Sequence, residues 1–305
     1  MTTTRLLRVG TRASLLARTQ TQWVLDRLGC AAETVLVSTE GDRSSVPLTQ
    51  LGGTGVFVSA LRSALLAGQI DLAVHSYKDL PTAPADGITV AAVPVREDPR
   101  DALCSRDGAT LLELPRGARI GTGSPRRAAQ LRALDLGLDI VAIRGNVDTR
   151  LGKLAGELDA VVLAAAGLQR LGLAERISEY LDPIQVLPAA AQGALAVECR
   201  ADDDETRAAL AALDDRASRA AVTAERALLA GLEAGCSAPV GALAEVSESD
   251  SGGLELFLRG SVTAIDGTDA VRLSATGDVN TADEIGRRLA DDLIELGANK
   301  MMGSS

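Results

Sequence analysis

The stretch LAVHSYKDLPT, residues 72–82, ends an apolar run in polar side chains that an ordinary turn does not need. Lys78 stands directly before Asp79, and His75 is the only histidine in the chain. A carboxylate held near a cationic intermediate stabilises positive charge and moves protons, which makes Asp79 a candidate for such chemistry. An ion pair or a turn is the alternative for Lys78 and Asp79. A lone histidine at the end of a buried strand is more often a packing residue than a base, so His75 is not predicted to be catalytic.

Arginines gather at three predicted turns that lead from a strand into a helix. Free backbone N–H groups beside guanidinium groups bind anions, and several guanidinium groups suit a ligand with several carboxylates or phosphates. Any one of these arginines can equally be a surface residue that binds nothing, but the repetition favours a shared anion site. The turns are GTRAS (Arg12, with Ser14 as cap), GTGSPRR (Ser124 as cap, Pro125, Arg126, Arg127) and IRGNVDTR (Arg144, Asn146 as cap, Arg150).

The four cysteines, Cys30, Cys104, Cys199 and Cys236, are far apart and show no C-x-x-C spacing. Neither a metal site nor a disulfide framework is predicted, and a reducing compartment fits. Cys236 lies among small residues in LEAGCSAPVGAL. An inert buried thiol is one interpretation, and a sulfur with room to carry a covalent group is the other.

Composition bounds the elements that must position these residues. A chain of 305 residues predicts two or three domains, and 46% apolar with only 2% aromatic residues predicts cores of Ala, Val, Leu and Ile in α/β layers. The net charge of −10 argues against nucleic acid as a partner. The amino terminus lacks the apolar core of a signal peptide and no run is long enough to cross a bilayer, so a cytoplasmic protein without a membrane partner is expected.

Residues 5–100 alternate short apolar runs with helical patterns, and residues 101–190 repeat this organisation, which predicts mainly parallel sheets covered by helices. Helices are predicted at 14–28, at 56–67 and after Pro125 and Asn146, and DAVVLAAAG (159–167) reads as a strand. GALAVECR (193–200) reads as a further strand, followed by a capped helix and a helix near 216–231. The tail carries alternating strands and a final helix from about 281, which predicts an antiparallel α+β module. The polar, glycine-rich segment 40–55 is expected to be a lid or a disordered loop.

Five motifs spread over nearly the whole chain resemble those of porphobilinogen deaminases, also called hydroxymethylbilane synthases. They are HSYKDLPT, GTGSPRRAAQLRA, IRGNVDTRLGKL, AAQGALAVECR and GCSAPVGA. The resemblance implies a transferase of heme biosynthesis that joins four porphobilinogen molecules, with release of ammonia, on a dipyrromethane primer to give hydroxymethylbilane. It implies a monomer with two domains similar to type II periplasmic binding proteins and a third, α+β domain with an antiparallel sheet. The implied boundaries are 1–96 with 194–216, 97–193, and 217–305, with the active cleft between the first two domains.

The resemblance also implies a role for each matching residue. Asp79 is the implied catalytic carboxylate, and Cys236 is the implied attachment site of the dipyrromethane. Cofactor contacts are implied for Ser76, Lys78, Thr122, Ser124, Arg126, Arg127, Arg144, Gly145 and Arg150, and substrate contacts for Arg12, Ser14, Arg170, Gln192 and Gly193. Thr54 and Ser59 stand where many relatives carry lysines, so the charge contacts of the lid are expected to be weaker or to come from elsewhere, such as Arg43 or Arg62.

Two other functions stay open at this point. A non-catalytic anion-binding module could use the same two-domain plan, because a fold does not determine a function. A cysteine-nucleophile hydrolase is the second alternative, and it would need His75 close to Cys236.

Overall fold

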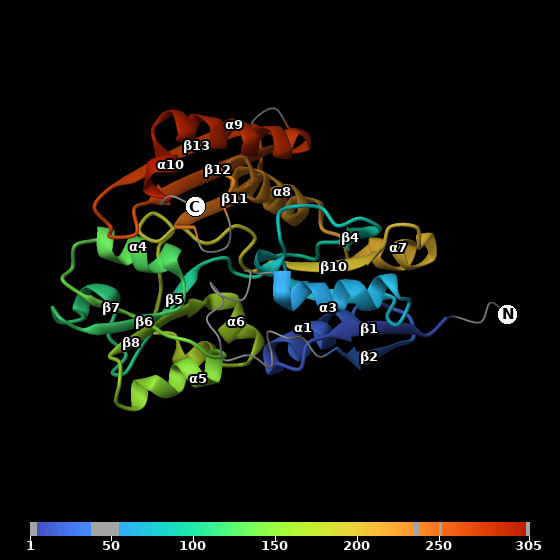
Figure 1. The fold of residues 1–305 in the computed structure, drawn as a ribbon, viewed down its shortest axis with the longest axis horizontal. Coiled ribbons are helices and arrows are strands. Elements are labelled where there is room, and N and C mark those ends of the chain that lie inside the picture. Colours follow the sequence, from blue (N-terminus) through green and yellow to red (C-terminus); the bar gives the residue numbers. More distant parts are fainter. Residues whose placement is uncertain (1–4, 38–54, 235–237, 250–251, 303–305) are drawn as a thin grey trace. The chain divides into compact units, whose positions relative to one another are not determined.

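The computed structural model describes residues 5–37, 55–234, 238–249 and 252–302. The chain divides into two compact units, Met1–Arg96 with Ala194–Arg219 and Glu97–Gly193 with Ala220–Ser305. Within the described residues the strands form two five-stranded sheets and one three-stranded sheet, and most of the strands are labelled in Figure 1. The α/β class with a separate antiparallel sheet is thereby confirmed, while the predicted three-domain boundaries stay a prediction.

The first unit is built on a mixed sheet in the order β2-β1-β3-β10-β4. Strands β2, β1 and β3 are parallel to one another, and β10 is antiparallel to both of its neighbours. Four strands therefore run in one direction and only β10 runs against them. The strands are β1 (Leu7–Thr11), β2 (Ala32–Leu36), β3 (Leu72–Ser76), β4 (Ile88–Ala92) and β10 (Leu195–Arg200).

Helices cover both faces of this sheet. Leu72 and Val74 of β3 pack in one cluster with Val24 of α1, whereas Ala73 packs in another with Leu61 of α3. Because successive side chains of a strand point to opposite faces, α1 and α3 lie on opposite faces of the sheet. The α7 helix shares the cluster of α1 through Leu210. These helices are α1 (Leu15–Leu25), α3 (Gly55–Leu66) and α7 (Asp204–Leu210).

The second unit repeats the arrangement in the order β7-β6-β8-β5-β9, with β5 antiparallel to both neighbours in the place that β10 takes in the first sheet. Leu103 and Val162 pack with Leu131 of α4, whereas Cys104 and Val161 pack in the cluster that includes side chains of α5 and α6. The elements are β5 (Asp101–Ser105), β6 (Arg119–Thr122), α4 (Pro125–Ala133), β7 (Asp139–Ala142), α5 (Val147–Gly152), β8 (Ala160–Ala164), α6 (Ala165–Arg170) and β9 (Glu179–Tyr180).

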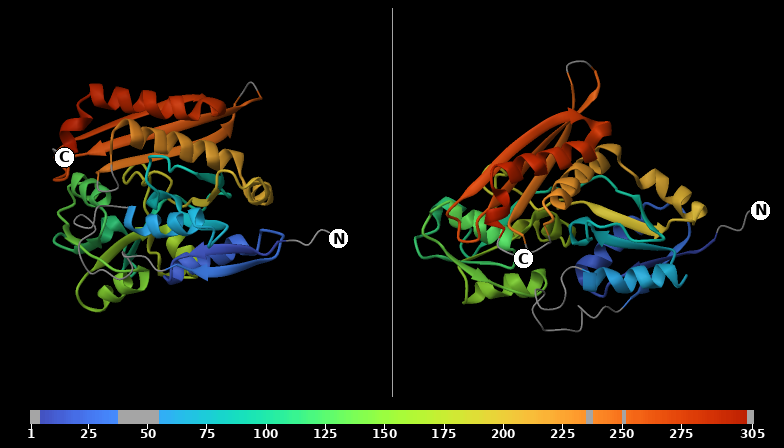
Figure 2. Two further views of the ribbon diagram at one scale, coloured as in Figure 1. Left: turned by 45° about the vertical axis from the view of Figure 1, so that its right-hand side comes forward. Right: turned by 45° about the horizontal axis from the view of Figure 1, so that its top comes forward.

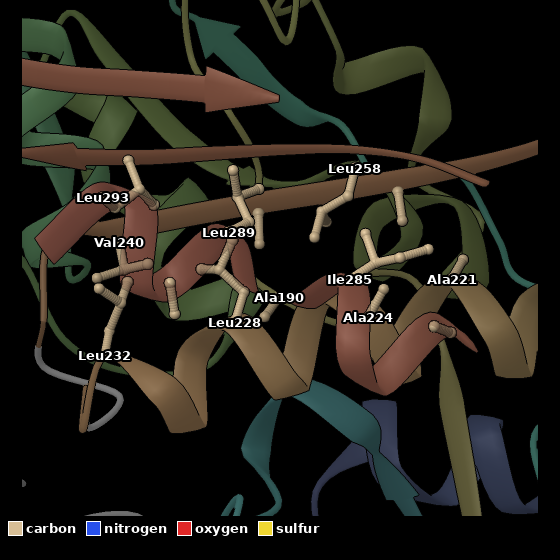
Figure 3. Packing of buried hydrophobic residues seen from close by; sticks show 14 of the residues in the cluster. Ala190, Ala221, Ala224, Leu228, Leu232, Val240, Leu258, Ile285, Leu289 and Leu293 are labelled. Atoms are coloured by element: carbon tan, nitrogen blue, oxygen red, sulfur yellow. The ribbon is translucent and has the colours of Figure 1, made fainter. Parts of the chain in front are cut away.

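The second unit also contains an antiparallel sheet in the order β11-β12-β13, and α9 packs along it in both views of Figure 2. Figure 3 shows side chains of α8 and α9 meeting beside this sheet, with Leu228 near Leu289 and Ala224 near Ile285. A Cβ added at Gly286 would lie 2.2 Å from the carbonyl oxygen of Ala224, so the two helices touch backbone to backbone. The elements are α8 (Arg216–Gly231), which belongs to this unit from Ala220 onward, β11 (Val240–Glu248), β12 (Leu254–Thr263), β13 (Ala270–Asp278), α9 (Ala282–Glu295) and α10 (Ala298–Met301).

Two element predictions need correction. The helix predicted at 14–28 ends at Leu25, and the run DAVVLAAAG is not one strand, because β8 ends at Ala164 and α6 begins at Ala165.

Among the described residues, no helix has both the length and the apolar character needed to cross a membrane. The described side chains also include no group of three or more His, Cys, Asp or Glu residues placed to hold a metal ion.

Candidate functional site

The first part of the candidate site is the turn that follows β3 in the first unit. A single 3-10 turn, Tyr77–Asp79, carries Lys78 half-buried and Asp79 exposed. The side chain of Ser76 is hydrogen-bonded to the buried amide of Gln20 on α1, with 3.0 Å from Nε2 to Oγ. The backbone N–H of Tyr77 donates to the carbonyl oxygen of Ala194 at 3.0 Å. Packing and hydrogen bonds therefore fix the base of the turn, while the Asp79 carboxylate reaches solvent.

Arg12 and Ser14 lie at the same edge of that sheet. Strand β1 is paired in parallel with β3, so the carboxyl ends of both strands, where Arg12 and Ser76 stand, point to one edge. Ser14 accepts a hydrogen bond from the backbone N–H of Ala17 at 3.3 Å, which confirms the predicted helix cap. The edge thus gathers Arg12, Ser14, Ser76, Lys78 and Asp79 from two turns.

A buried cluster of charged side chains, which includes His75, lies directly before this turn. Glu198 on β10 accepts hydrogen bonds from Arg62 of α3, the shortest at 2.7 Å, and its carboxylate lies 3.2 Å from Nε2 of His75 without hydrogen-bond geometry. Burial opposes the charge of Glu198, but His75 and Arg62 outweigh it and lower the pKa of Glu198 to about 2. His75 is therefore a buried partner of Glu198, in line with the packing role predicted for it. Sequence reasoning missed Glu198, although a carboxylate within the apolar run ALAVECR was a visible signal.

In the second unit, the start of α4 places two arginines on one aspartate. Arg126, Arg127 and Asp101 are 3%, 5% and 0% exposed. Arg126 Nη2 lies 2.8 Å from Asp101 Oδ2, and Arg127 Nη2 lies 2.7 Å from Oδ1. Gln192 joins them, because its Nε2 donates to Asp101 Oδ1 at 2.7 Å and its Oε1 accepts from Arg127 Nη2 at 3.2 Å. Sequence reasoning named both arginines and Gln192 but missed Asp101, the first residue of an otherwise apolar strand.

The charges of this cluster shift the pKa values of its members. Burial opposes ionisation of Asp101, yet Arg126, Arg127 and Gln192 outweigh it and hold the pKa of that carboxyl well below its usual range. Burial, together with the nearby charge of Arg127, lowers the pKa of Arg126, and Asp101 counteracts part of that effect. Two guanidinium groups share one carboxylate, so the cluster holds one positive charge in excess.

The turn that carries Gln192 is held in an unusual backbone conformation. Ala191 and Gly193 both have positive φ, 59° and 87°, and a Cβ at Gly193 would lie 2.3 Å from the carbonyl oxygen of Glu97. The buried carboxylate of Glu225 on α8 accepts from the backbone N–H of Ala191 at 2.6 Å. Arg170 Nη2 donates to the carbonyl oxygen of Gly193 at 2.7 Å, and burial lowers the pKa of Arg170 to about 10. The structure therefore brings Arg127, Arg170, Gln192 and Gly193 together.

The remaining predicted contacts of the second unit lie on the turns after β6 and β7. Ser124 caps α4 by accepting from the backbone N–H of Arg127 at 3.4 Å, and its own N–H donates to Thr122 Oγ1 at 3.2 Å. A Cβ at Gly123 would lie 3.5 Å from Nη2 of Arg150, so that guanidinium reaches the turn after β6. Asn146 caps α5 as predicted, at 2.9 Å from the N–H of Thr149, while Arg144 and Gly145 are exposed on the turn before it.

Three of the four cysteines, Cys30, Cys104 and Cys199, lie in the part of the chain that the structure describes. Burial raises the pKa of Cys104 and of Cys199 to about 11, which keeps both thiols protonated and inert near neutral pH. Cys236, the predicted attachment site, lies outside the described residues, as do Thr54 and Arg43 of the predicted lid. Arg62, named as a possible substitute for the lid lysines, is held by Glu198. The hydrolase alternative, which needs His75 beside Cys236, is not tested.

Comparison with known proteins gives matches over most of the chain. Residues 7–208 match the family described as "Porphobilinogen deaminase, dipyromethane cofactor binding domain", and residues 219–295 match "Porphobilinogen deaminase, C-terminal domain". A protein named porphobilinogen deaminase from Nocardia farcinica is 61% identical over 304 residues, which cover 97% of this chain and 88% of that protein. A protein of the same name from Mycobacterium tuberculosis H37Rv is 60% identical over 305 residues, covering 97% and 98%.

Solved structures of solute-binding proteins align at low similarity. An arginine-specific periplasmic binding protein from Salmonella typhimurium is 14% identical with a TM-score of 0.38, covering 70% of this chain and 94% of that one. The L-cystine solute receptor of Neisseria gonorrhoeae is 13% identical with a TM-score of 0.36, covering 68% and 85%.

Proposed function

The chain belongs to the porphobilinogen deaminase family, and from this membership we propose that it joins four porphobilinogen molecules, with release of ammonia, into hydroxymethylbilane. It is an enzyme of tetrapyrrole synthesis, and the proposed reaction is that of a transferase. The observation that carries the proposal is the match to both family domains together with about 60% identity over 97% of the chain. The alternative of a non-catalytic binding module has no support among these relatives. The expected monomeric state and cytoplasmic location stay predictions.

We propose that the arginine cluster of the second unit holds a dipyrromethane cofactor through its carboxylates. Two features of the described residues fit such a group. Asp101 balances only one of the two buried guanidinium charges, and the buried Nε of Arg126 has no hydrogen-bond partner within the described part of the chain. When bound, the dipyrromethane supplies the pyrrole carbon on which the chain grows. Cofactor contacts are proposed for Ser76, Lys78, Thr122, Ser124, Arg126, Arg127, Arg144, Gly145 and Arg150, and substrate contacts for Arg12, Ser14, Arg170, Gln192 and Gly193.

Asp79 is the proposed catalytic carboxylate. When ammonia leaves the aminomethyl group of porphobilinogen, the bonding electrons leave with the nitrogen and positive charge develops on the pyrrole. A fixed carboxylate beside that charge stabilises it more in the transition state than in the ground state, and can accept the proton lost by the pyrrole carbon that forms the new bond. The exposed position of Asp79 on a turn with a fixed base supports this role, because its carboxylate is available to a ligand.

The test is the intact mass of the purified protein. A thioether to a dipyrromethane survives denaturation, so the chain should exceed its sequence mass by two linked pyrrole units, and peptide mapping should locate the adduct on Cys236. The Cys236→Ser variant should have the bare sequence mass and no activity, because a hydroxyl is too weakly nucleophilic at neutral pH to capture the cationic pyrrole. Cys30→Ser is the matched control and should retain both adduct and activity, since Cys30 is half-buried within the cluster beside α1. An active wild-type protein with the bare mass would refute the covalent cofactor.

A further inference from the structure

We infer that Asp101 is the positioning residue that sets the direction of both guanidinium groups of the pair Arg126 and Arg127. The inference rests on the function proposed above and concerns a residue that would act through the arginines rather than touch the ligand. Asp101 is the first residue of β5, and Arg126 and Arg127 lie in the first turn of α4. Among the described residues it is the one carboxylate within ion-pair distance of either guanidinium.

Each carboxylate oxygen of Asp101 contacts one of the two arginines. Oδ2 forms an ion pair with Nη2 of Arg126 at 2.8 Å without hydrogen-bond geometry, whereas Oδ1 accepts a hydrogen bond from Nε of Arg127 at 2.9 Å and lies 2.7 Å from its Nη2. A planar guanidinium held along its Nε–Nη2 edge has a fixed orientation. Because one carboxylate contacts both groups, their mutual repulsion is offset only while Asp101 is charged.

Backbone and amide acceptors complete the hold on Arg127. Its Nη1 donates to the carbonyl oxygen of Val162 at 3.2 Å, and its Nη2 to Gln192 Oε1 at 3.2 Å. All three nitrogens of this guanidinium therefore have protein acceptors. Arg126 is held less completely, since its Nη1 donates to the carbonyl oxygen of Leu187 at 2.6 Å but its Nε has no partner within the described residues. The Nε–H of Arg126 is therefore a donor without a partner among the described residues. The cluster as a whole keeps one net positive charge.

A positioning role and a purely structural role predict different results for Asp101→Asn. The asparagine keeps the size of the side chain but removes the charge, so the two guanidinium groups repel each other and lose their preset direction. If Asp101 only stabilises the fold, the variant should unfold more easily and otherwise behave normally. If it positions the pair, contacts to ligand carboxylates should weaken even in the folded protein, so that KM rises more than kcat falls.

Asp71 offers a matched control in the first unit. It is also fully buried, directly precedes a strand, and pairs with Arg5, Arg8 and Arg200, yet none of these residues belongs to the proposed site. Asp71→Asn should therefore lower the unfolding temperature much as Asp101→Asn does. Three quantities are compared in full-length wild type and both variants: the unfolding temperature, the fraction carrying the dipyrromethane by intact mass, and KM and kcat for porphobilinogen below the unfolding temperature.

Asp101→Asn is expected to lower the fraction carrying the cofactor and to raise KM by about tenfold or more, the loss of one charge-assisted contact, while Asp71→Asn leaves both near the wild-type values. The inference is overturned if the two variants match in cofactor content and KM. Should Asp101→Asn not accumulate as folded protein, Asp101→Glu decides, because it keeps the charge but moves the carboxylate away from the position that both guanidinium groups contact: a raised KM supports the inference and an unchanged KM overturns it. Wild-type protein with neither adduct nor porphobilinogen consumption would instead refute the proposed function, and this inference with it.

Discussion

Asp79 and Asp101 show that two aspartates can serve different purposes in different surroundings. Asp79 is exposed at the end of a 3-10 turn, where a ligand can reach it. Asp101 is wholly buried, and the two arginines on it hold its pKa far below the usual range. A carboxylate available to solvent can meet charge that develops on a ligand, whereas a buried and paired one keeps its neighbours in place.

At the level of single residues, Asp79→Asn should leave the fold intact and lower kcat by about 100-fold or more, because the amide cannot balance positive charge that develops on the substrate. Steady-state assays with porphobilinogen measure the effect. Asp86→Asn is the control, since Asp86 is also exposed and lies between β3 and β4. Near-normal turnover in folded Asp79→Asn would remove Asp79 from the catalytic role.

Glu198 should make the fold sensitive to acid. Its pKa is lowered from 4.5 to about 2 in the folded protein, so its charge stabilises the fold above pH 4.5 and that contribution is lost as the pH falls toward 2. Glu198→Gln should cost about 3–5 kcal/mol at neutral pH, because Arg62 and His75 lose their buried partner, and should reduce the loss of stability between pH 5 and pH 2.

Urea unfolding at a series of pH values measures this prediction. Glu245→Gln is the control, because Glu245 is exposed and its ion pair with Arg259 should contribute under about 1 kcal/mol. An acid profile of Glu198→Gln that parallels the wild type would show that Glu198 is not the group responsible.

At the level of elements, the periodicity of apolar residues and the helix-capping residues predicted most of the fold. The helix from 216 to 231 is confirmed, as are the caps Ser14, Ser124 and Asn146. Strands β4 and β11 were missed, since ITVAA and VGALAEVSE mix apolar residues with alanine, glycine or polar residues and give a weak alternation. The end of β8 was misplaced because alanine is apolar enough for a strand and is also the best helix former.

The same physical reasons explain which site residues could be predicted. Residues at turns, such as Arg126 and Gly193, carry local signals of charge or backbone conformation. Asp101 and Glu198 carry a weaker signal, because each is a carboxylate in a largely apolar strand and its role depends on partners that the local sequence does not contain. Their partners, Arg127 and Arg62, lie 26 and 136 positions away in the chain and meet them only after folding.

The turn before β10 offers an element-level test. Gly193→Ala should lower stability by more than the roughly 1–2 kcal/mol that a positive φ costs a residue with a Cβ, because that Cβ would also meet the carbonyl oxygen of Glu97 at 2.3 Å. It should also impair cofactor loading, since the turn carries Gln192. Gly172→Ala isolates the backbone cost, because Gly172 has φ of 70° with nothing within 4 Å of an added Cβ. Equal losses of stability in the two variants would contradict the predicted clash.

At the level of the whole molecule, cofactor loading should stabilise the protein as any ligand that binds only the folded state does. The excess positive charge of the arginine cluster would be balanced by a ligand carboxylate, a contact of about 1.5–3 kcal/mol. Cys236→Ser should therefore unfold at a temperature about 5 °C or more below the wild type, given roughly 2–4 °C per kcal/mol for units of this size. Differential scanning calorimetry measures this, with Cys30→Ser as the loaded control. Equal unfolding temperatures would argue that the cofactor carboxylates gain nothing from the cluster.

The position of β10 in its sheet has a consequence for the newly made chain. It is inserted between β3 and β4, yet it is translated only after the whole of 97–193. Until residue 200 has left the ribosome, β3 has no partner on one side, and an unpaired apolar edge invites association with other chains. Glu198 arrives on the same strand, so the buried partner of His75 and Arg62 is also absent until then. The sheet that carries Asp79 is begun first and completed after the sheet that follows it in the sequence.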